Sequence, residues 1–320
     1  MGRKCQRHKH KILPSNIDPT NLPNEASMSK DEKLTPTKTG FIEVEDDTRQ
    51  IYWEYFGNGD KEVVVFLNGL AMLTKSWYRT VPFLYPDYDI LLYDYFGQGQ
   101  SSQEDESYFI NKLADYLVWA MDAGGVDKIH PVGVSYGGFI GAELGRLHQD
   151  RLHTLTLSGI LLTRETLFQM YHDISLRFYD STDEVFDLYT QYLYEKTFGE
   201  NISRKIYGEA MERGRFKFYD RYKDKKYCLV RLTEAQDPFF ENIDNDPDAY
   251  RNVLTPTLIL TGDQDRAIPP WQQAKMADIL PNSRQIMVPE CGHMTYMERP
   301  DFFWPTLRKF LAAKSVDFQV

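Results

Sequence analysis

The sequence predicts an α/β protein with a mostly parallel, eight-stranded sheet, helices on both faces and an inserted helical cap. Short, nearly continuous apolar runs recur along the chain, as is typical of strands covered on both faces. Helical apolar spacing separates most of the later runs, and this alternation favours parallel strands. The first runs have no helices between them, so the sheet is expected to begin with antiparallel strands.

The composition fits a large acidic domain and excludes several other classes. The chain has 320 residues and a formal net charge of −10, from 37 Lys and Arg against 47 Asp and Glu. This balance disfavours a nucleic-acid binder, whose affinity depends on neutralising phosphates. The longest apolar runs are too short to cross a bilayer, so no integral membrane segment is expected.

Cysteine and histidine usage indicates a reducing compartment and chemistry without a metal. The three cysteines, Cys5, Cys228 and Cys291, are an odd number and show no CxxC spacing. Such usage favours free thiols and a cytoplasmic location over a disulfide framework. The seven histidines form no HExxH motif and no Cys/His cluster, so no metal is expected.

The chain is expected to begin with a segment that does not fold by itself. Residues 1–38 are rich in Lys, Pro, Asn, Ser and Thr, and their few apolar residues show no period. Such a segment buries too little apolar surface to offset its ordering entropy. We therefore expect a disordered basic tail, followed by a core domain over residues 39–162 and 254–320.

Strands and helices are expected from residue 41 onward. The expected strands are Phe41–Val44, Ile51–Phe56, Val63–Leu67, Ile90–Tyr93, Ile129–Val134, Leu152–Leu157, Thr257–Leu260 and Arg284–Val288. The first expected helix carries apolar residues on one face from Ile110 to Met121 and ends at the glycines at 124 and 125. Later helices are expected at residues 137–148, 271–280 and 302–313.

The stretch between Ser158 and Thr257 breaks the alternation of strands and helices. Helical patterns dominate it, and Phe and Tyr are dense there. We expect an inserted helical cap over residues 163–253. Because aromatic residues pack more often than they bind ligands, no cap residue is singled out as a site.

The strongest local motif is Gly133-Val134-Ser135-Tyr136-Gly137, which follows an apolar run and precedes a helical pattern. This context is typical of a nucleophile elbow, a strained turn that projects a serine hydroxyl. Glycines are needed on either side because the flanking backbone passes very close. Ser135 is therefore the candidate nucleophile.

A serine hydroxyl needs a base within hydrogen-bond reach, and the base needs a carboxylate to orient it. His293 is the candidate base, because it lies in a loop between the last expected strand and the last expected helix. The candidate acids are Asp263 and Asp265, in the loop after the strand that begins at Thr257. Asp265 is favoured because it follows a glycine turn, and Asp263 remains the alternative.

An acyl-transfer site also needs preorganised donors for the oxyanion of its tetrahedral intermediate. The elbow can supply the backbone N–H of Tyr136, and the loop after the third expected strand can supply that of Leu70. In that loop, Asn68 and Gly69 would support the donor, since glycine allows close backbone approach. A simple Asn-Gly turn is the alternative interpretation of this dipeptide.

These motifs together resemble those of the capped α/β-hydrolase family over roughly residues 41–315. The order Ser135, Asp265, His293 is the family's order. The turn Asp94-Tyr95-Phe96-Gly97-Gln98-Gly99-Gln100-Ser101 resembles the family's D-x-x-G-x-G-x-S turn, and Gly292-His293-x4-Glu298-x-Pro300 also matches. One departure is Asn68-Gly69, where the family usually has His-Gly.

The residues and the resemblance predict a serine hydrolase acting on a small-molecule substrate. It would cleave a carboxylic ester, thioester or lactone of an apolar acyl group through an acyl-enzyme, without a cofactor. Two alternatives stay open: an acyltransferase with the same triad, and a non-enzymatic ligand receptor on the same fold. The sequence gives no indication of the oligomeric state.

Overall fold

A computed structural model describes residues 35–44, 48–206 and 209–320, which lie in the compact unit Thr35–Val320. Most of the expected basic tail therefore lies outside the described residues. Its last positions are described: the Thr37 N–H donates to the carbonyl of Tyr55 at 2.7 Å, and Lys38 begins the first strand. The folded part thus starts slightly earlier than the sequence pattern indicates.

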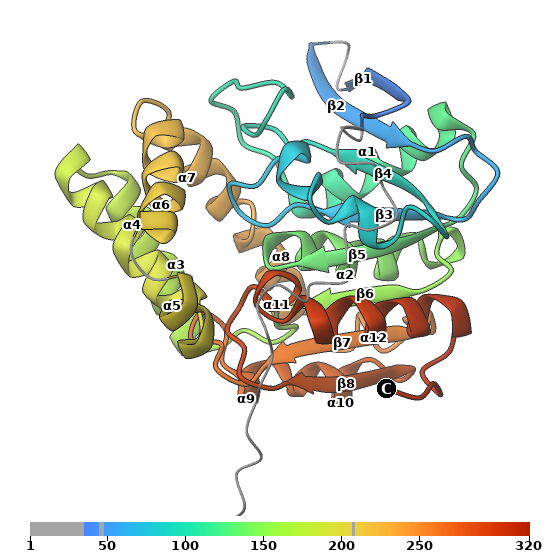
Figure 1. Ribbon diagram of the computed structural model, residues 1–320. Coiled ribbons are helices and arrows are strands. Elements are labelled where there is room, and N and C mark those ends of the chain that lie inside the picture. Colours follow the sequence, from blue (N-terminus) through green and yellow to red (C-terminus); the bar gives the residue numbers. More distant parts are fainter. Residues whose placement is uncertain (1–34, 45–47, 207–208) are drawn as a thin grey trace, which may run out of the picture. The chain divides into compact units, whose positions relative to one another are not determined.

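The described residues form an eight-stranded sheet in the order β1-β2-β4-β3-β5-β6-β7-β8 (Figure 1). The β1–β2 and β2–β4 pairs are antiparallel, and all the other pairs are parallel. This confirms the predicted mostly parallel sheet. The strands are β1 (Lys38–Val44), β2 (Arg49–Phe56), β3 (Val63–Leu67), β4 (Asp89–Tyr93), β5 (Ile129–Val134), β6 (Leu155–Ser158), β7 (Thr257–Gly262) and β8 (Ser283–Val288).

Helices connect the parallel strands and form the segment between β6 and β7. The α-helices are α1 (Ile110–Gly124), α2 (Tyr136–Leu147), α3 (Thr166–Tyr179), α4 (Asp183–Thr197), α5 (Glu200–Ile206), α6 (Glu209–Tyr222), α7 (Lys226–Glu234), α8 (Asp237–Asn245), α9 (Pro270–Gln273), α10 (Lys275–Ile279), α11 (Thr295–Glu298) and α12 (Pro300–Ala313). Short 3-10 helices are η1 (Thr74–Trp77), η2 (Val81–Phe83) and η3 (Gln149–Arg151). In the part of the chain that the structure describes, no helix is long and apolar enough to span a membrane.

Two expected elements differ in detail from the structure. The strand expected at 152–157 begins only at Leu155, because Leu152 ends η3 and makes just an isolated bridge to Ile129. The single helix expected at 271–280 is divided into α9 and α10 at Ala274, where the Ala277 N–H bonds to the Ala274 carbonyl in a tighter i→i+3 turn.

Helices cover both faces of the sheet, as predicted. Neighbouring strand residues point to opposite faces, and Phe66 and Leu67 of β3 touch different helices. Phe66 meets the ring of Trp304 in α12, with 5.9 Å between centroids. A Cβ on Gly141 of α2 would lie 3.4 Å from Leu67 Cδ1. The helices α2 and α12 therefore lie on opposite faces.

The helices α3–α8 form one continuous insertion between β6 and β7. In Figure 1, α3–α6 stand beyond the end of the sheet toward which β5, β6 and β7 point. Aromatic side chains hold these helices together: Phe186, Tyr179 and Tyr189 are almost fully buried, and the Tyr179 and Tyr189 hydroxyls are 2.9 Å apart. The division into a core and a cap at residues 163 and 253 stays a prediction.

Candidate active site

Ser135 lies in a sharp turn between β5 and α2. Its φ of 55° and ψ of −127° are strained for a residue with a side chain. Its backbone N–H donates to the carbonyl of Ser158 at 2.8 Å. A Cβ on Gly133 would lie 2.6 Å from the Gly137 carbonyl oxygen, and one on Gly137 would lie 2.2 Å from the Leu67 carbonyl oxygen. The glycines therefore allow the close approach that holds Ser135 in this turn.

His293 lies in the loop between β8 and α11 and contacts a buried carboxylate. Its Nδ1 is 2.8 Å from Asp265 Oδ2, and both side chains are largely buried. The edge of its ring packs against the turn after β6, where a Cβ on Gly159 would lie 2.6 Å from His293 Cε1. The loops after β6, β7 and β8 thus meet at this histidine.

Asp265 is held in place by four hydrogen bonds. Its Oδ1 accepts the N–H groups of Ala267 and Ile268, each at 2.9 Å. Its Oδ2 accepts from His293 and, at 2.9 Å, from Nε2 of Gln273. Gln273 is fully buried, and its Oε1 accepts from the Gly159 N–H at 3.2 Å. Gln273 is not predicted from the sequence, because no local motif marks it.

Asp263 faces a different partner. Its Oδ1 accepts the backbone N–H of Cys291 at 3.0 Å. Among the hydrogen bonds of the described residues, the carboxylate that contacts His293 is that of Asp265. The geometry therefore favours Asp265 as the orienting acid, and its catalytic role stays a prediction.

The environment of His293 shifts its proton affinity. Burial disfavours the imidazolium, but the charge of Asp265 and its hydrogen bond to the ring favour it. The balance raises the pKa of His293 above its ordinary value of 6.5. A partner that stabilises the imidazolium in this way suits a base that must take a proton during a reaction.

The loop after β3 lies directly beside Ser135. A Cβ on Gly69 would lie 3.6 Å from the Ser135 Cβ. Asn68 fixes this loop, because its Nδ2 donates to the Tyr93 carbonyl at 3.0 Å and its Oδ1 accepts from Trp77 Nε1 at 2.7 Å. The amide at this position thus makes two buried hydrogen bonds.

Two backbone N–H groups beside Ser135 are available as donors. Within the described ranges, the N–H groups of Leu70 and Tyr136 have no protein acceptor in the hydrogen-bond network, and both residues line the same cavity as Ser135. Tyr136 is the first residue of α2, where N–H groups have no partner within the helix. The arrangement resembles that of an oxyanion hole, and this role stays a prediction.

The turn at residues 94–101 supports the segment that follows the loop after β3. The Asp94 carboxylate accepts the N–H groups of Thr74 at 2.7 Å and Gln100 at 2.9 Å. Gly99 has a φ of 51°, and a Cβ there would lie 1.8 Å from Asp94 Oδ2. Glycine is therefore required for the turn to close around the carboxylate.

Glu298, in the loop motif around His293, binds two separate segments. Its Oε2 accepts the N–H groups of Gly199 at 2.9 Å and Gly292 at 3.0 Å, and its Oε1 accepts that of Met294 at 3.2 Å. The His293 N–H donates to the Thr197 carbonyl at 2.7 Å. The histidine loop is thus fastened to the junction between α4 and α5.

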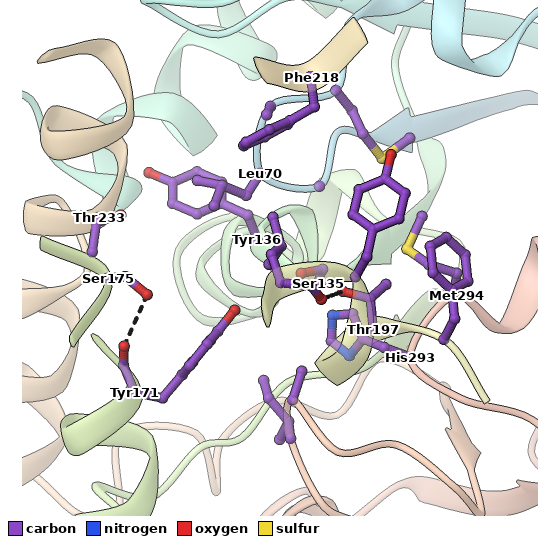
Figure 2. Close-up of a pocket in the computed structure, with 18 of the residues that line it drawn as sticks. Leu70, Ser135, Tyr136, Tyr171, Ser175, Thr197, Phe218, Thr233, His293 and Met294 are labelled. Carbon is purple, nitrogen blue, oxygen red and sulfur yellow. Dashed lines mark hydrogen bonds between the residues drawn. The ribbon is translucent and has the colours of Figure 1, made fainter. Parts of the chain in front are cut away.

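Ser135 and His293 line one cavity of about 360 Å³ (Figure 2). The loop at 69–72, the start of α2, the histidine loop and the inserted helices enclose it. Most of its lining is apolar or aromatic, including Phe139, Phe168, Leu193, Phe198, Phe218 and Ile268. Such a lining suits an uncharged, apolar part of a ligand.

A second cluster of titratable groups lies at the opposite end of β5. Glu62, His130 and His153 offer possible ligand atoms within 4.8 Å of one another. Burial lowers the pKa of His130 to about 4, and its Nε2 lies 3.3 Å from Glu62. The ammonium of Lys314 also donates to Oε1 of Glu62, so this carboxylate already has a cationic partner.

The chain belongs to the α/β-hydrolase fold family, whose model matches residues 62–300. It is 26% identical over 267 residues to a Mycobacterium tuberculosis protein named as the non-heme bromoperoxidase BpoC, covering 81% of this chain and 97% of that one. It is 25% identical over 299 residues to 2-hydroxy-6-oxo-6-(2'-aminophenyl)hexa-2,4-dienoic acid hydrolase of Metapseudomonas resinovorans, covering 90% and 97% of the two chains.

A solved structure shows the same fold. MGS-M2, an α/β-hydrolase enzyme from a Medee basin deep-sea metagenome library, superposes with a TM-score of 0.78 at 22% identity, covering 88% of this chain and all (100%) of that one. The family description and the name of the Metapseudomonas relative indicate a hydrolase.

Proposed function

We propose that this chain is a serine hydrolase that cleaves a carboxylic ester of an apolar acyl group, with thioesters and lactones as related substrates. One observation carries the proposal. Ser135, in its strained turn, lines the same cavity as His293, and His293 is bonded to the buried carboxylate of Asp265. A nucleophile, a base and an orienting acid are the groups that acyl transfer requires.

In the proposed reaction, the Ser135 hydroxyl attacks the carbonyl carbon while His293 Nε2 takes its proton. Asp265 accepts from Nδ1–H, which keeps the lone pair on Nε2 and stabilises the imidazolium. The oxyanion binds the N–H groups of Leu70 and Tyr136. When the intermediate collapses, His293 returns the proton to the leaving alcohol, and water then hydrolyses the acyl-enzyme by the same steps.

The relatives support hydrolysis, and the cavity lining supports an apolar substrate. The Metapseudomonas relative is named as a hydrolase of a dienoic acid, which favours hydrolysis over other chemistry on this fold. The aromatic lining of the cavity would accommodate an apolar acyl chain. In this proposal the helices between residues 163 and 253 act as a cap that covers the acyl group.

The proposal is tested with p-nitrophenyl esters of increasing chain length and with a fluorophosphonate probe. Wild-type protein should show a burst of p-nitrophenol and covalent labelling, and Ser135→Ala should abolish both with little change in Tm. The matched control is Ser181→Ala, whose hydroxyl bonds to the Phe178 carbonyl away from the residues that line the cavity. It should behave as wild type. Turnover by Ser135→Ala above a few per cent of wild type would overturn the proposal.

A further inference from the structure

Helix α6 presents two positive charges to the cavity. Gly214, Lys217, Phe218 and Arg221 follow the i, i+3, i+4, i+7 spacing of one helix face, and all four line the cavity. The guanidinium of Arg221 donates to the Ala71 carbonyl at 3.0 Å, next to the proposed oxyanion donor Leu70. Lys217 makes no hydrogen bond or ion pair within the described part of the chain.

Neighbouring cations of the insertion have carboxylate partners. Arg215 Nη1 lies 2.5 Å from Asp187, and Lys223 Nζ lies 2.8 Å from Asp220. Further along, Arg231 Nε lies 2.7 Å from Asp105. Neither Lys217 nor Arg221 has such a partner among the described residues, although the chain carries ten more acidic than basic residues (net charge −10).

The cavity itself supplies no compensating negative charge. Among the described residues that line it, none is Asp or Glu. The nearby acidic residues of α6 bind other cations: Glu212 binds Arg215 at 3.0 Å, and Asp220, three residues after Lys217, binds Lys223 at 2.8 Å. Two like charges four residues apart on a helix repel each other. Lys217 and Arg221 thus retain a net positive charge that an anionic ligand would neutralise.

We propose that Lys217 and Arg221 form a carboxylate-binding subsite at the mouth of the cavity, so that the natural substrate is an ester or lactone that also carries a carboxylate. This inference rests on the proposed function and specifies its substrate class. A carboxylate accepts two hydrogen bonds from the guanidinium fork, which still has free donors beyond its bond to Ala71. The apolar lining would hold the chain between the carboxylate and the ester.

The kinetic test compares two esters that differ in one charge. Mono-p-nitrophenyl suberate carries a free carboxylate, and methyl p-nitrophenyl suberate replaces it with a neutral ester. Wild-type protein should favour the anion in kcat/KM by about tenfold, since hydrogen bonds to charged groups discriminate on this scale. Raising the salt from about 0.05 M to about 0.5 M should reduce the preference several-fold because both cations are exposed.

Two variants test whether Lys217 and Arg221 cause the preference for the anionic ester. The double variant Lys217→Gln/Arg221→Gln should bring the ratio of the two kcat/KM values close to one. The matched control is Lys223→Gln, which removes a paired cation that does not line the cavity, and it should keep the wild-type ratio. A wild-type ratio near one, or a double variant that keeps the preference, would overturn the subsite.

A binding measurement separates failure of the subsite from failure of the proposed chemistry. Calorimetry with Ser135→Ala protein compares monomethyl suberate, an anion, with dimethyl suberate, which is neutral. Tighter binding of the anion, lost in the triple variant Ser135→Ala/Lys217→Gln/Arg221→Gln, supports the subsite even if no ester is turned over. Equal binding of the two ligands would overturn it, even if esters are hydrolysed.

Discussion

Ser135 has a backbone conformation that serine rarely adopts in an unfolded chain. A positive φ for a residue with a side chain costs roughly 1–3 kcal/mol, which the surrounding packing must offset. The packing comes from the close passage of β3, β5 and α2, which Gly133 and Gly137 make possible. The fold thus holds the backbone of Ser135 in a strained conformation, and in this conformation the residue lines the cavity.

The two aspartates after β7 are distinguished by replacing each with asparagine. Asp265→Asn should lower kcat by about 10³- to 10⁴-fold, because the neutral amide permits the wrong tautomer of His293. Asp263→Asn should cost about tenfold or less, since it keeps an oxygen that can accept from Cys291. Both variants are assayed side by side with one activated ester. If Asp263→Asn were the less active variant, Asp263 rather than Asp265 would be the orienting acid.

The pH dependence of kcat/KM should report the ionisation of His293. A protonated imidazole cannot take the Ser135 proton, so activity should fall as the pH drops through the raised pKa of His293, above 6.5. In Asp265→Asn, loss of the negative charge should lower the pKa of His293. The acidic limb of the pH profile should therefore move to lower pH. Both profiles are measured from about pH 5 to about pH 9 with circular dichroism as a control for unfolding. An unchanged limb in the variant would show that another group controls it.

At the scale of elements, one carboxylate joins the histidine loop to the insertion. Glu298 accepts three backbone N–H groups from these two segments. In Glu298→Gln, the amide N–H₂ would face a backbone N–H, so we expect a loss of about 1–3 kcal/mol of unfolding free energy and a lower kcat. Urea unfolding and ester assays measure both effects.

The control for Glu298 is an exposed glutamate in the same region. Glu290→Gln alters a carboxylate that accepts from Asn201 Nδ2 at 2.7 Å on the surface. It should change the unfolding free energy by no more than about 0.5 kcal/mol. If the two variants were equally stable, the bonds of Glu298 would not fasten the loop.

The sequence predicts those parts of the site that depend on short, local patterns. Ser135, Gly69 and His293 each lie in a short motif that is visible in the sequence itself, so local pattern is enough to propose them as candidates. Gln273 and Arg221 are different, because their partners Gly159 and Ala71 are 114 and 150 residues away in the chain. Contacts of that kind arise only when the tertiary structure brings the segments together.

At the scale of the whole molecule, the sequence predicts a mostly parallel sheet but not the exact start of the folded part. The run of alternating strands and helices predicts the parallel sheet. The first strand is less marked in the sequence, because β1 lies at the sheet edge and most of its residues are exposed. Apolar patterning is weak in such a strand, and so its beginning at Lys38 is missed.

Two truncations test where the folded part begins. Removal of residues 1–34 should leave Tm and esterase activity unchanged, because the bonds of Thr37 to Tyr55 and Gly57 are kept. Removal of residues 1–40 also deletes these bonds and part of the β1–β2 pairing, and should cost about 1–3 kcal/mol. Thermal unfolding measures both. A large loss of Tm in the shorter truncation would show that residues 1–34 stabilise the domain.

The attachment of the histidine loop to the α4–α5 junction has a consequence for turnover. The His293 N–H binds Thr197, and Glu298 binds Gly199, so a movement that lifted this junction would also displace the imidazole. Exchange of product for substrate therefore leaves His293 aligned only along a path that does not lift this junction. Helix α6 lines the cavity through Lys217, Phe218 and Arg221, and we expect the path of exchange to run along it.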